Sequence, residues 1–124
     1  MLVVGATGGK AGPAEDCDQV ADPDLQIRGC SRFLELVKGN KEGQAIVYTI
    51  RGSAYANKGK SDRAIADYTK AIQINPQYAN AYNNRGNVYR EKGQHARAIA
   101  DLRRSHVLGN SRATRSLKEL GVKP

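Results

Sequence analysis

Residues 45–78 read AIVYTIRGSAYANKGKSDRAIADYTKAIQINPQY, and residues 79–112 read ANAYNNRGNVYREKGQHARAIADLRRSHVLGNSR. The two stretches align without a gap at a spacing of 34 residues. Twelve of the 34 aligned pairs are identical, and the segment RAIAD recurs whole. Self-similarity at a fixed spacing of this size indicates a repeat architecture, in which each unit is one supersecondary element stacked on the next.

Each unit carries two apolar patterns of helical period. In the first unit, Tyr48, Gly52 and Tyr55 recur at spacings of four and three residues, which places them on one face of a helix. Gly59 predicts the end of that helix, and Ser61 is a candidate N-terminal cap for the next one. That second helix has an apolar stripe of its own, formed by Ala64, Ile65, Tyr68, Ala71 and Ile72. The chain is therefore predicted to be all-α.

Small residues occupy corresponding places in the two units. Gly52 and Gly86 allow a facing backbone to approach closely, and Ala64 and Ala98 do the same from the facing helix. Large Tyr side chains fill the space between them. This alternation of large and small residues predicts that the two helices of each unit interlock as an antiparallel pair.

The pattern resembles the tetratricopeptide repeat. The motif of that family is complete in the first unit, at Tyr48, Gly52, Tyr55, Ala64, Tyr68, Ala71 and Pro76. The second unit matches at Tyr82, Gly86, Tyr89 and Ala98 and departs at Leu102, Ser105 and Asn110. The resemblance implies an α-α superhelix of antiparallel helix pairs, about six helices in all, that acts as a protein-binding scaffold or adaptor and not as an enzyme.

Single helices are expected on both sides of the repeats. Asp22 and Pro23 predict a helix start, before an apolar stripe that runs from Leu25 to Val37. This Cys-containing helix resembles the second helix of a degenerate repeat, as found in small bacterial proteins of the family. After the repeats, Ser111 is expected to cap a short terminal helix. The predicted organisation is a disordered segment 1–13, an N-terminal helical cap 14–44, repeat units 45–78 and 79–112, and a capping helix 113–124.

Two full repeats are fewer than the three or so that such an array usually needs for stability. Either the flanking helices supply the missing burial, or the protein associates with itself.

The net charge of +8 is unevenly distributed. Residues 1–40 hold four basic and six acidic residues, whereas residues 89–124 hold nine basic and three acidic residues. A basic region invites a nucleic acid or an anionic lipid surface as partner, and this is the alternative function. Because no base-stacking aromatic residues alternate with these charges, we favour a solvated helix surface and do not expect nucleic acid as a partner. No apolar stretch approaches the length of a membrane span.

The sequence offers no convincing set of catalytic, cofactor or metal-binding residues. The glycine-rich turn at residues 3–12 resembles the nucleotide-binding turn of short-chain dehydrogenases, but Pro13 interrupts the helix that would receive the phosphates. His95 and His106 lie eleven residues apart, about 16 Å along a helix, which is too far for one metal ion. No cofactor is expected.

Cys17 and Cys30 are the only cysteines. Their even number, the small size of the domain and the family resemblance favour a disulfide between them, and the alternative is two buried thiols in a reducing compartment. A disulfide would favour a periplasmic or secreted protein whose export signal is missing from this sequence or trimmed. The alternative location is the cytoplasm.

Two charged pairs recur with the repeat. Arg51 and Arg85 each precede the motif Gly, and Asp67 and Asp101 follow sixteen residues after each Arg. One hypothesis is an Arg–Asp contact between the two helices of each unit. The other is a set of independent surface charges.

The family resemblance also implies a peptide-binding groove lined by the first helix of each unit. The positions expected to face it are Thr49, Ser53, Asn80, Asn83, Asn87 and Arg90. Side-chain amides can donate to and accept from a peptide backbone, although a merely hydrophilic groove is the alternative. Chaperone-binding members of the family hold an acidic tail with Lys and Asn, where this chain has Thr49 and Ser53. We therefore do not expect such a tail as the ligand.

Overall fold

The computed structural model describes residues 12–124, and this part of the chain forms seven helices and no strand. Two helices precede the repeats, α1 (Pro13–Cys17) and α2 (Pro23–Leu36). The repeats contain α3 (Lys41–Asn57), α4 (Ser61–Ile74), α5 (Ala79–Glu91) and α6 (His95–Val107), and α7 (Ser111–Glu119) follows them. The prediction of an all-α chain is confirmed.

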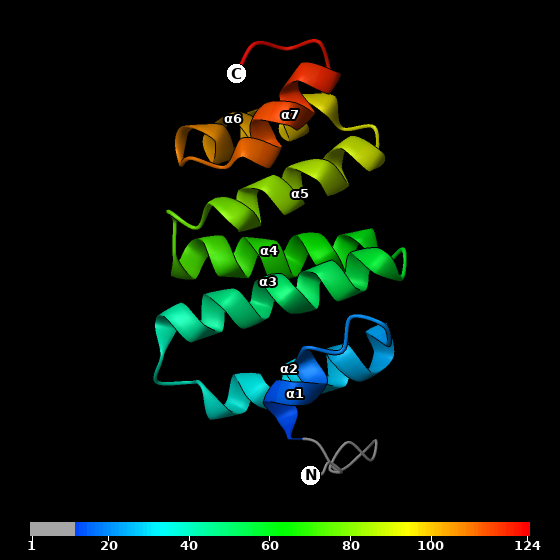
Figure 1. Cartoon of the computed structure of the whole chain (residues 1–124), viewed down its shortest axis with the longest axis vertical. Coiled ribbons are helices and arrows are strands. Elements are labelled where there is room, and N and C mark those ends of the chain that lie inside the picture. Colours follow the sequence, from blue (N-terminus) through cyan, green and yellow to red (C-terminus); the bar gives the residue numbers. More distant parts are fainter. Residues whose placement is uncertain (1–11) are drawn as a thin grey trace, which may run out of the picture.

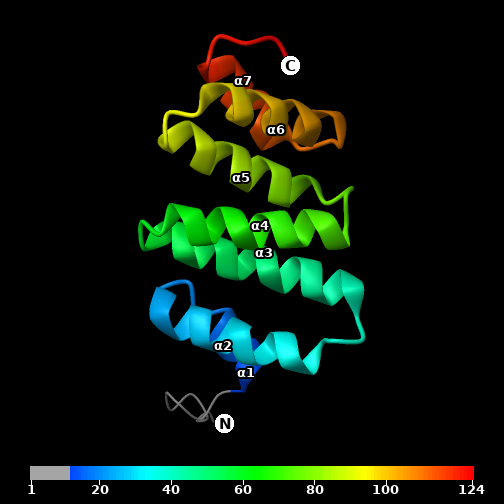
Figure 2. The ribbon, with the colours of Figure 1, turned by 180° about the vertical axis from the view of Figure 1, so that it is seen from behind.

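The helices stack along one axis in antiparallel pairs. Figure 1 shows α1, α3 and α7 in front of α2, α4 and α6, and Figure 2 shows the same stack from behind. Helices α1 and α7 lie toward opposite ends of the stack (Figure 1). Helix α3 packs against α4 and α5 against α6, while α2–α3, α4–α5 and α6–α7 contacts join one pair to the next. The molecule is the predicted α-α superhelix.

The helix ends follow the sequence signals in part. Gly59 and Gly93 adopt positive φ angles of 75° and 77° and end α3 and α5, as predicted. Asp22 caps α2, because its carboxylate accepts a hydrogen bond from the Leu25 backbone N–H. Two predicted caps are wrong by one residue, since Ser61 and Ser111 are the first residues of α4 and α7. The N-terminal cap of α7 is Asn110, whose side-chain oxygen accepts from two backbone N–H groups; the cap of α4 is Lys60, without a side-chain bond.

The motif glycines lie where two helices of a pair touch. A Cβ atom on Gly52 would be 2.8 Å from the ring of Tyr68 and 3.2 Å from the Ala64 carbonyl oxygen. A Cβ atom on Gly86 would be 3.0 Å from the Leu102 side chain. The predicted close approach is therefore present in both units.

The core consists of small clusters along the stack, each shared by neighbouring helices. One joins α1, α2 and α3 through Cys17, Cys30, Leu34 and Val47. Two more lie in the repeats, built on Ala45, Ala71 and Ala81 and on Ala64, Tyr68 and Val88. The last, formed by Leu102, Ala113 and Leu117, fixes α7. Stability of such a stack is carried by contacts between neighbours, so each end depends on its own cluster.

None of the helices in the described part of the chain is both long and apolar enough to traverse a membrane.

Candidate functional site

The two Arg–Asp pairs predicted from the repeat are present with the same geometry. Arg51 donates two hydrogen bonds to the carboxylate of Asp67, both at 2.8 Å. Arg85 donates two to Asp101, at 2.7 and 2.9 Å. These bonds raise the pKa of both Arg residues above the ordinary value. The hypothesis of independent surface charges is wrong.

Each of these Arg residues also reaches the preceding pair of helices. Arg51 donates to the Ser31 hydroxyl of α2 at 3.0 Å, and Arg85 donates to the Thr69 hydroxyl of α4 at 3.0 Å. Arg51 further lies over the rings of Tyr48 and Tyr55, and Arg85 over the corresponding rings of the second unit. One guanidinium per repeat therefore joins three helices. It fixes the position of each helix pair against the pair before it.

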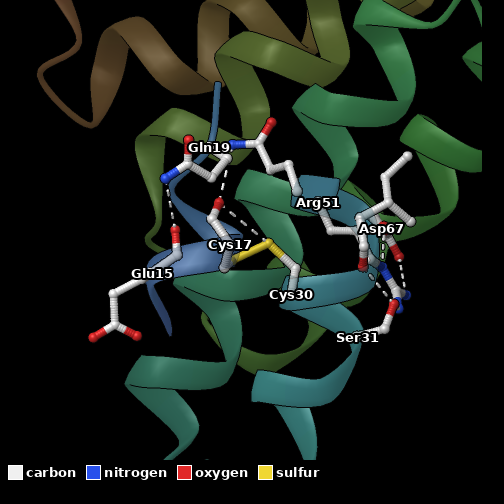
Figure 3. The surroundings of a disulfide bond; sticks show 9 residues. Glu15, Cys17, Gln19, Cys30, Ser31, Arg51 and Asp67 are labelled. Carbon is white, nitrogen blue, oxygen red and sulfur yellow. Dashed lines mark hydrogen bonds and ion pairs between the residues drawn. A yellow bond between two sulfur atoms is a disulfide. The ribbon is translucent and has the colours of Figure 1, made fainter. Parts of the chain in front are cut away.

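The N-terminal pair of helices is joined by a disulfide between Cys17 and Cys30, as predicted (Figure 3). The Gln26 side chain donates to the Cys17 carbonyl oxygen at 3.0 Å, which fixes the end of α1 on α2. Ser31, the partner of Arg51, directly follows Cys30, and Figure 3 shows the disulfide beside the Arg51–Asp67 pair. Cys30 and its neighbour Ser31 thus link the disulfide to the hydrogen bonds that Arg51 makes in the first repeat.

A groove opens where the first helices of the pairs lie next to one another. It is a cavity of about 300 Å³ between the turn after α1 and the helices α2, α3, α5 and α7. We call it the groove and define it by its lining residues, Asp18, Val20, Gln26, Thr49, Ile50, Ser53, Asn57, Tyr78, Asn80, Asn84 and Arg112.

Three of the six predicted groove residues line this cavity. Thr49 is mostly buried, and its hydroxyl donates to the Ala45 carbonyl oxygen at 2.9 Å. Ser53 hydrogen-bonds the Tyr68 hydroxyl at 3.0 Å and accepts from Asn84 at 3.4 Å. The Asn80 side-chain oxygen accepts from Asn110 at 3.0 Å and from Arg112 at 3.2 Å. These polar side chains are held by internal contacts and present a fixed surface.

The other three predicted residues do not line the cavity. Asn83 is buried and donates to the Asn84 side-chain oxygen at 3.2 Å, and Arg90 forms an ion pair with Glu119 of α7 at 3.2 Å. The side-chain oxygens of Asn83 and Asn87 are buried without a hydrogen-bond partner within the described residues. Their role as ligand contacts remains a prediction.

Sequence reasoning missed the groove residues that come from outside the first helices of the repeats. Asp18 and Val20 belong to the turn between α1 and α2, and Arg112 lies in the first turn of α7. No repeated pattern marks these positions. The high exposure of Val20, 69%, is an observation that only the structure supplies.

Other candidate chemistry has little support in the described part of the chain. Within residues 12–124 no group of three or more His, Cys, Asp and Glu side chains is placed to hold a metal ion. His95 is exposed, and His106 hydrogen-bonds the Thr114 hydroxyl at 2.7 Å. The glycine-rich turn at residues 3–12 lies outside the described residues except for Gly12.

The comparisons with known proteins agree with the geometry. Residues 52–93 match the family model described as TPR repeat, which covers the end of the first unit and the start of the second. Residues 52–93 of this chain are thus similar to the tetratricopeptide repeat. Nothing among curated protein sequences matches it significantly.

Three solved structures illustrate the likeness in fold. The Arabidopsis OM64 TPR domain has a TM-score of 0.74 and 24% identity, over 87% of this chain and 88% of that one. The first TPR of Spaghetti (RPAP3), bound to the HSP90 peptide SRMEEVD, has a TM-score of 0.75 and 24% identity, over 86% and 83%. MamA has a TM-score of 0.71 and 26% identity, over 86% of this chain and 64% of that one.

Proposed function

We propose that this protein is a non-catalytic interaction module that takes an extended segment of a partner protein in its groove. The observation that carries the proposal is the groove itself, a cavity lined by residues from four helices and two of the segments that connect helices. Asn57 and Tyr78 line it and make no side-chain hydrogen bond within residues 12–124, so their polar groups are available to a ligand.

A peptide ligand suits the shape and chemistry of this surface. Amide and hydroxyl groups along α3 and α5 can pair with the backbone of an extended chain, and Ile50 and Tyr78 offer apolar contact. The likeness to a TPR domain solved with an HSP90 peptide supports a peptide as ligand. The acidic tail of that complex is not proposed for this chain, because Thr49 and Ser53 bring no positive charge.

The test is a comparison of three immobilised proteins in extract of the source cells: the native chain, Asn57→Trp and Gln73→Trp. Asn57 is an exposed residue of the groove, and Trp there would fill the cavity. Gln73 is an exposed residue of α4 outside the groove and serves as the matched control. We expect a protein that the native chain and the control retain and that Asn57→Trp loses. Equal recovery by all three would reject the groove as the binding surface.

The same experiment at two salt concentrations separates the alternative function. Polyanion binding through the basic C-terminal helices would fall by orders of magnitude between about 50 and 200 mM salt and would not respond to Asn57→Trp.

We also propose that the protein works in an oxidising compartment outside the cytosol. The disulfide between α1 and α2 supports this, because such bonds persist mainly in oxidising environments. Thiol alkylation of the protein in intact source cells, before lysis, would leave both Cys residues unmodified; rapid alkylation of both would contradict the proposal.

A further inference from the structure

The groove has opposite charges at its two ends. Asp18 lies at the N-terminal end, in the turn after α1, and Arg112 lies at the C-terminal end, in the first turn of α7. Within residues 12–124, Asp18 takes part in no ion pair. Arg112 contacts the neutral side chain of Asn80 and no carboxylate in this part of the chain. Neither charge therefore has an ion-pair partner among the described residues.

The surface between these charges is partly apolar. Val20 is 69% exposed, and Ile50 and Tyr78 line the same cavity. One turn before Ile50, Ile46 is 46% exposed. One exposed and two half-buried apolar side chains at one cavity, with the exposed Ile46 one turn away, indicate contact with an apolar group of a partner.

The acidic end is held in place by covalent structure. Asp18 directly follows Cys17, whose sulfur is bonded to Cys30, and the backbone N–H of Asp18 donates to the Glu15 carbonyl oxygen at 3.1 Å. The carboxylate is therefore attached to a fixed backbone, and a charged ligand group would meet it at little cost in ordering.

We infer that the groove selects an extended peptide segment with an apolar centre, a basic residue on one side and an acidic residue on the other. This inference rests on the proposed function and adds the chemistry of the segment. The basic residue of the bound segment pairs with Asp18, and its acidic residue pairs with Arg112. The apolar side chain of the segment packs on Val20, Ile50 and Tyr78. Complementary charges of this kind select the partner and reject segments with like charges at both ends.

The test is selection of displayed random linear peptides on the oxidised full chain. Peptides bound by the native chain should carry Lys or Arg on one side of an apolar residue and Asp or Glu on the other. Selection on Asp18→Lys should shift toward acidic residues on both sides, and selection on Arg112→Glu toward basic residues on both sides. Both positions are exposed, and circular dichroism confirms that the variants remain folded.

Affinity measurements on one selected peptide then isolate the contact with Asp18. Replacing the basic residue of the peptide by Gln should weaken binding to the native chain about two- to five-fold, the range of an exposed ion pair. The same replacement should have no effect on binding to Asp18→Asn.

The outcomes separate this inference from the proposed function. Peptides that Asn57→Trp loses, but that carry no charge pattern or do not change with the two charge variants, would overturn the inference and leave groove binding in place. A selection that yields no peptide, or only peptides that Asn57→Trp retains, would overturn both.

Discussion

The two helices of a pair are held together differently in the repeats and in the N-terminal pair, α1 and α2. In the repeats, helices of 13 to 17 residues interlock through Gly and a large side chain, and an Arg–Asp pair joins them. In the N-terminal pair, α1 has only five residues. It is joined to α2 by a disulfide, and the α2 glycine, Gly29, is in contact with the α1 backbone.

The difference shows what length contributes to a helix pair. A helix of five residues has little apolar surface to bury, so its position cannot depend on the hydrophobic effect alone. A cross-link restricts the unfolded chain and replaces part of that missing contribution. The groove depends on the disulfide, because Asp18 and Val20 follow α1 directly and the disulfide holds α1 in place.

The largest effect is expected from removal of the disulfide. Replacing Cys17 and Cys30 together by Ala should lower the free energy of unfolding by about 3 kcal/mol, given the short loop that the bond closes. Amide hydrogen exchange should become faster in α1 and α2 and remain unchanged in α6, because contacts in the stack are between neighbours. Equal acceleration in all helices would show that the stack unfolds as one unit and would contradict the division into two regions.

The Arg–Asp pairs should have the next largest effect. Asp67→Ala and Asp101→Ala should each lower the free energy of unfolding by about 2 kcal/mol, because each leaves a half-buried guanidinium without its acceptor. The two costs should agree closely, since the geometries agree. Urea unfolding measures both, and recovery of the melting temperature in the reversed pair Arg51→Glu with Asp67→Arg is the control. A cost in one repeat alone would show that the two pairs are not equivalent.

A smaller loss is expected where the repeats depend on close approach. Gly52→Ala should cost about 1 kcal/mol, because the new methyl group displaces the Tyr68 ring and Ala's better helix propensity offsets only part of that. Gly39→Ala is the matched control, since a Cβ atom there meets nothing within 4 Å and its φ is not positive. The melting temperature of Gly52→Ala should be lower than that of Gly39→Ala. Equal melting temperatures would mean that the interface between α3 and α4 can accommodate a methyl group.

The sequence predicted well what the repeat encodes twice. The helices, the motif glycines and both Arg–Asp pairs follow from pairs of residues 34 apart, so each observation supports the other. The extra first turn of α3, from Lys41, has no counterpart in α5 and was therefore outside the aligned unit. Helix α1, which begins at Pro13, is too short to show a helical period.

The groove was predicted only in part, for a related reason. Family resemblance identified the helix that faces it, and Thr49, Ser53 and Asn80 line it. Resemblance does not give the tilt of α7 against α5, which determines that Arg90 faces Glu119. Nor does it give the turn that places Asp18 at the cavity, because that turn depends on a cross-link outside the repeats.

The smallest effect concerns the ion pair that joins the two regions at the surface. The Lys58 ammonium of α3 hydrogen-bonds Asp24 of α2 and lowers the pKa of that carboxyl below its ordinary value. The ion pair therefore stabilises the folded chain above the ordinary carboxyl pKa, and this contribution is lost as the pH falls through the lower pKa of the folded state.

Because Asp24 is exposed, the change in stability should be small, so the sharper measurement is an NMR titration of its carboxyl carbon. Lys58→Met should return the pKa of Asp24 toward its ordinary value, whereas Lys70→Met, at an exposed position of α4, should leave it unchanged. A low pKa that persists in Lys58→Met would mean that neighbouring charges, such as Arg28 and Lys60, stabilise the carboxylate instead.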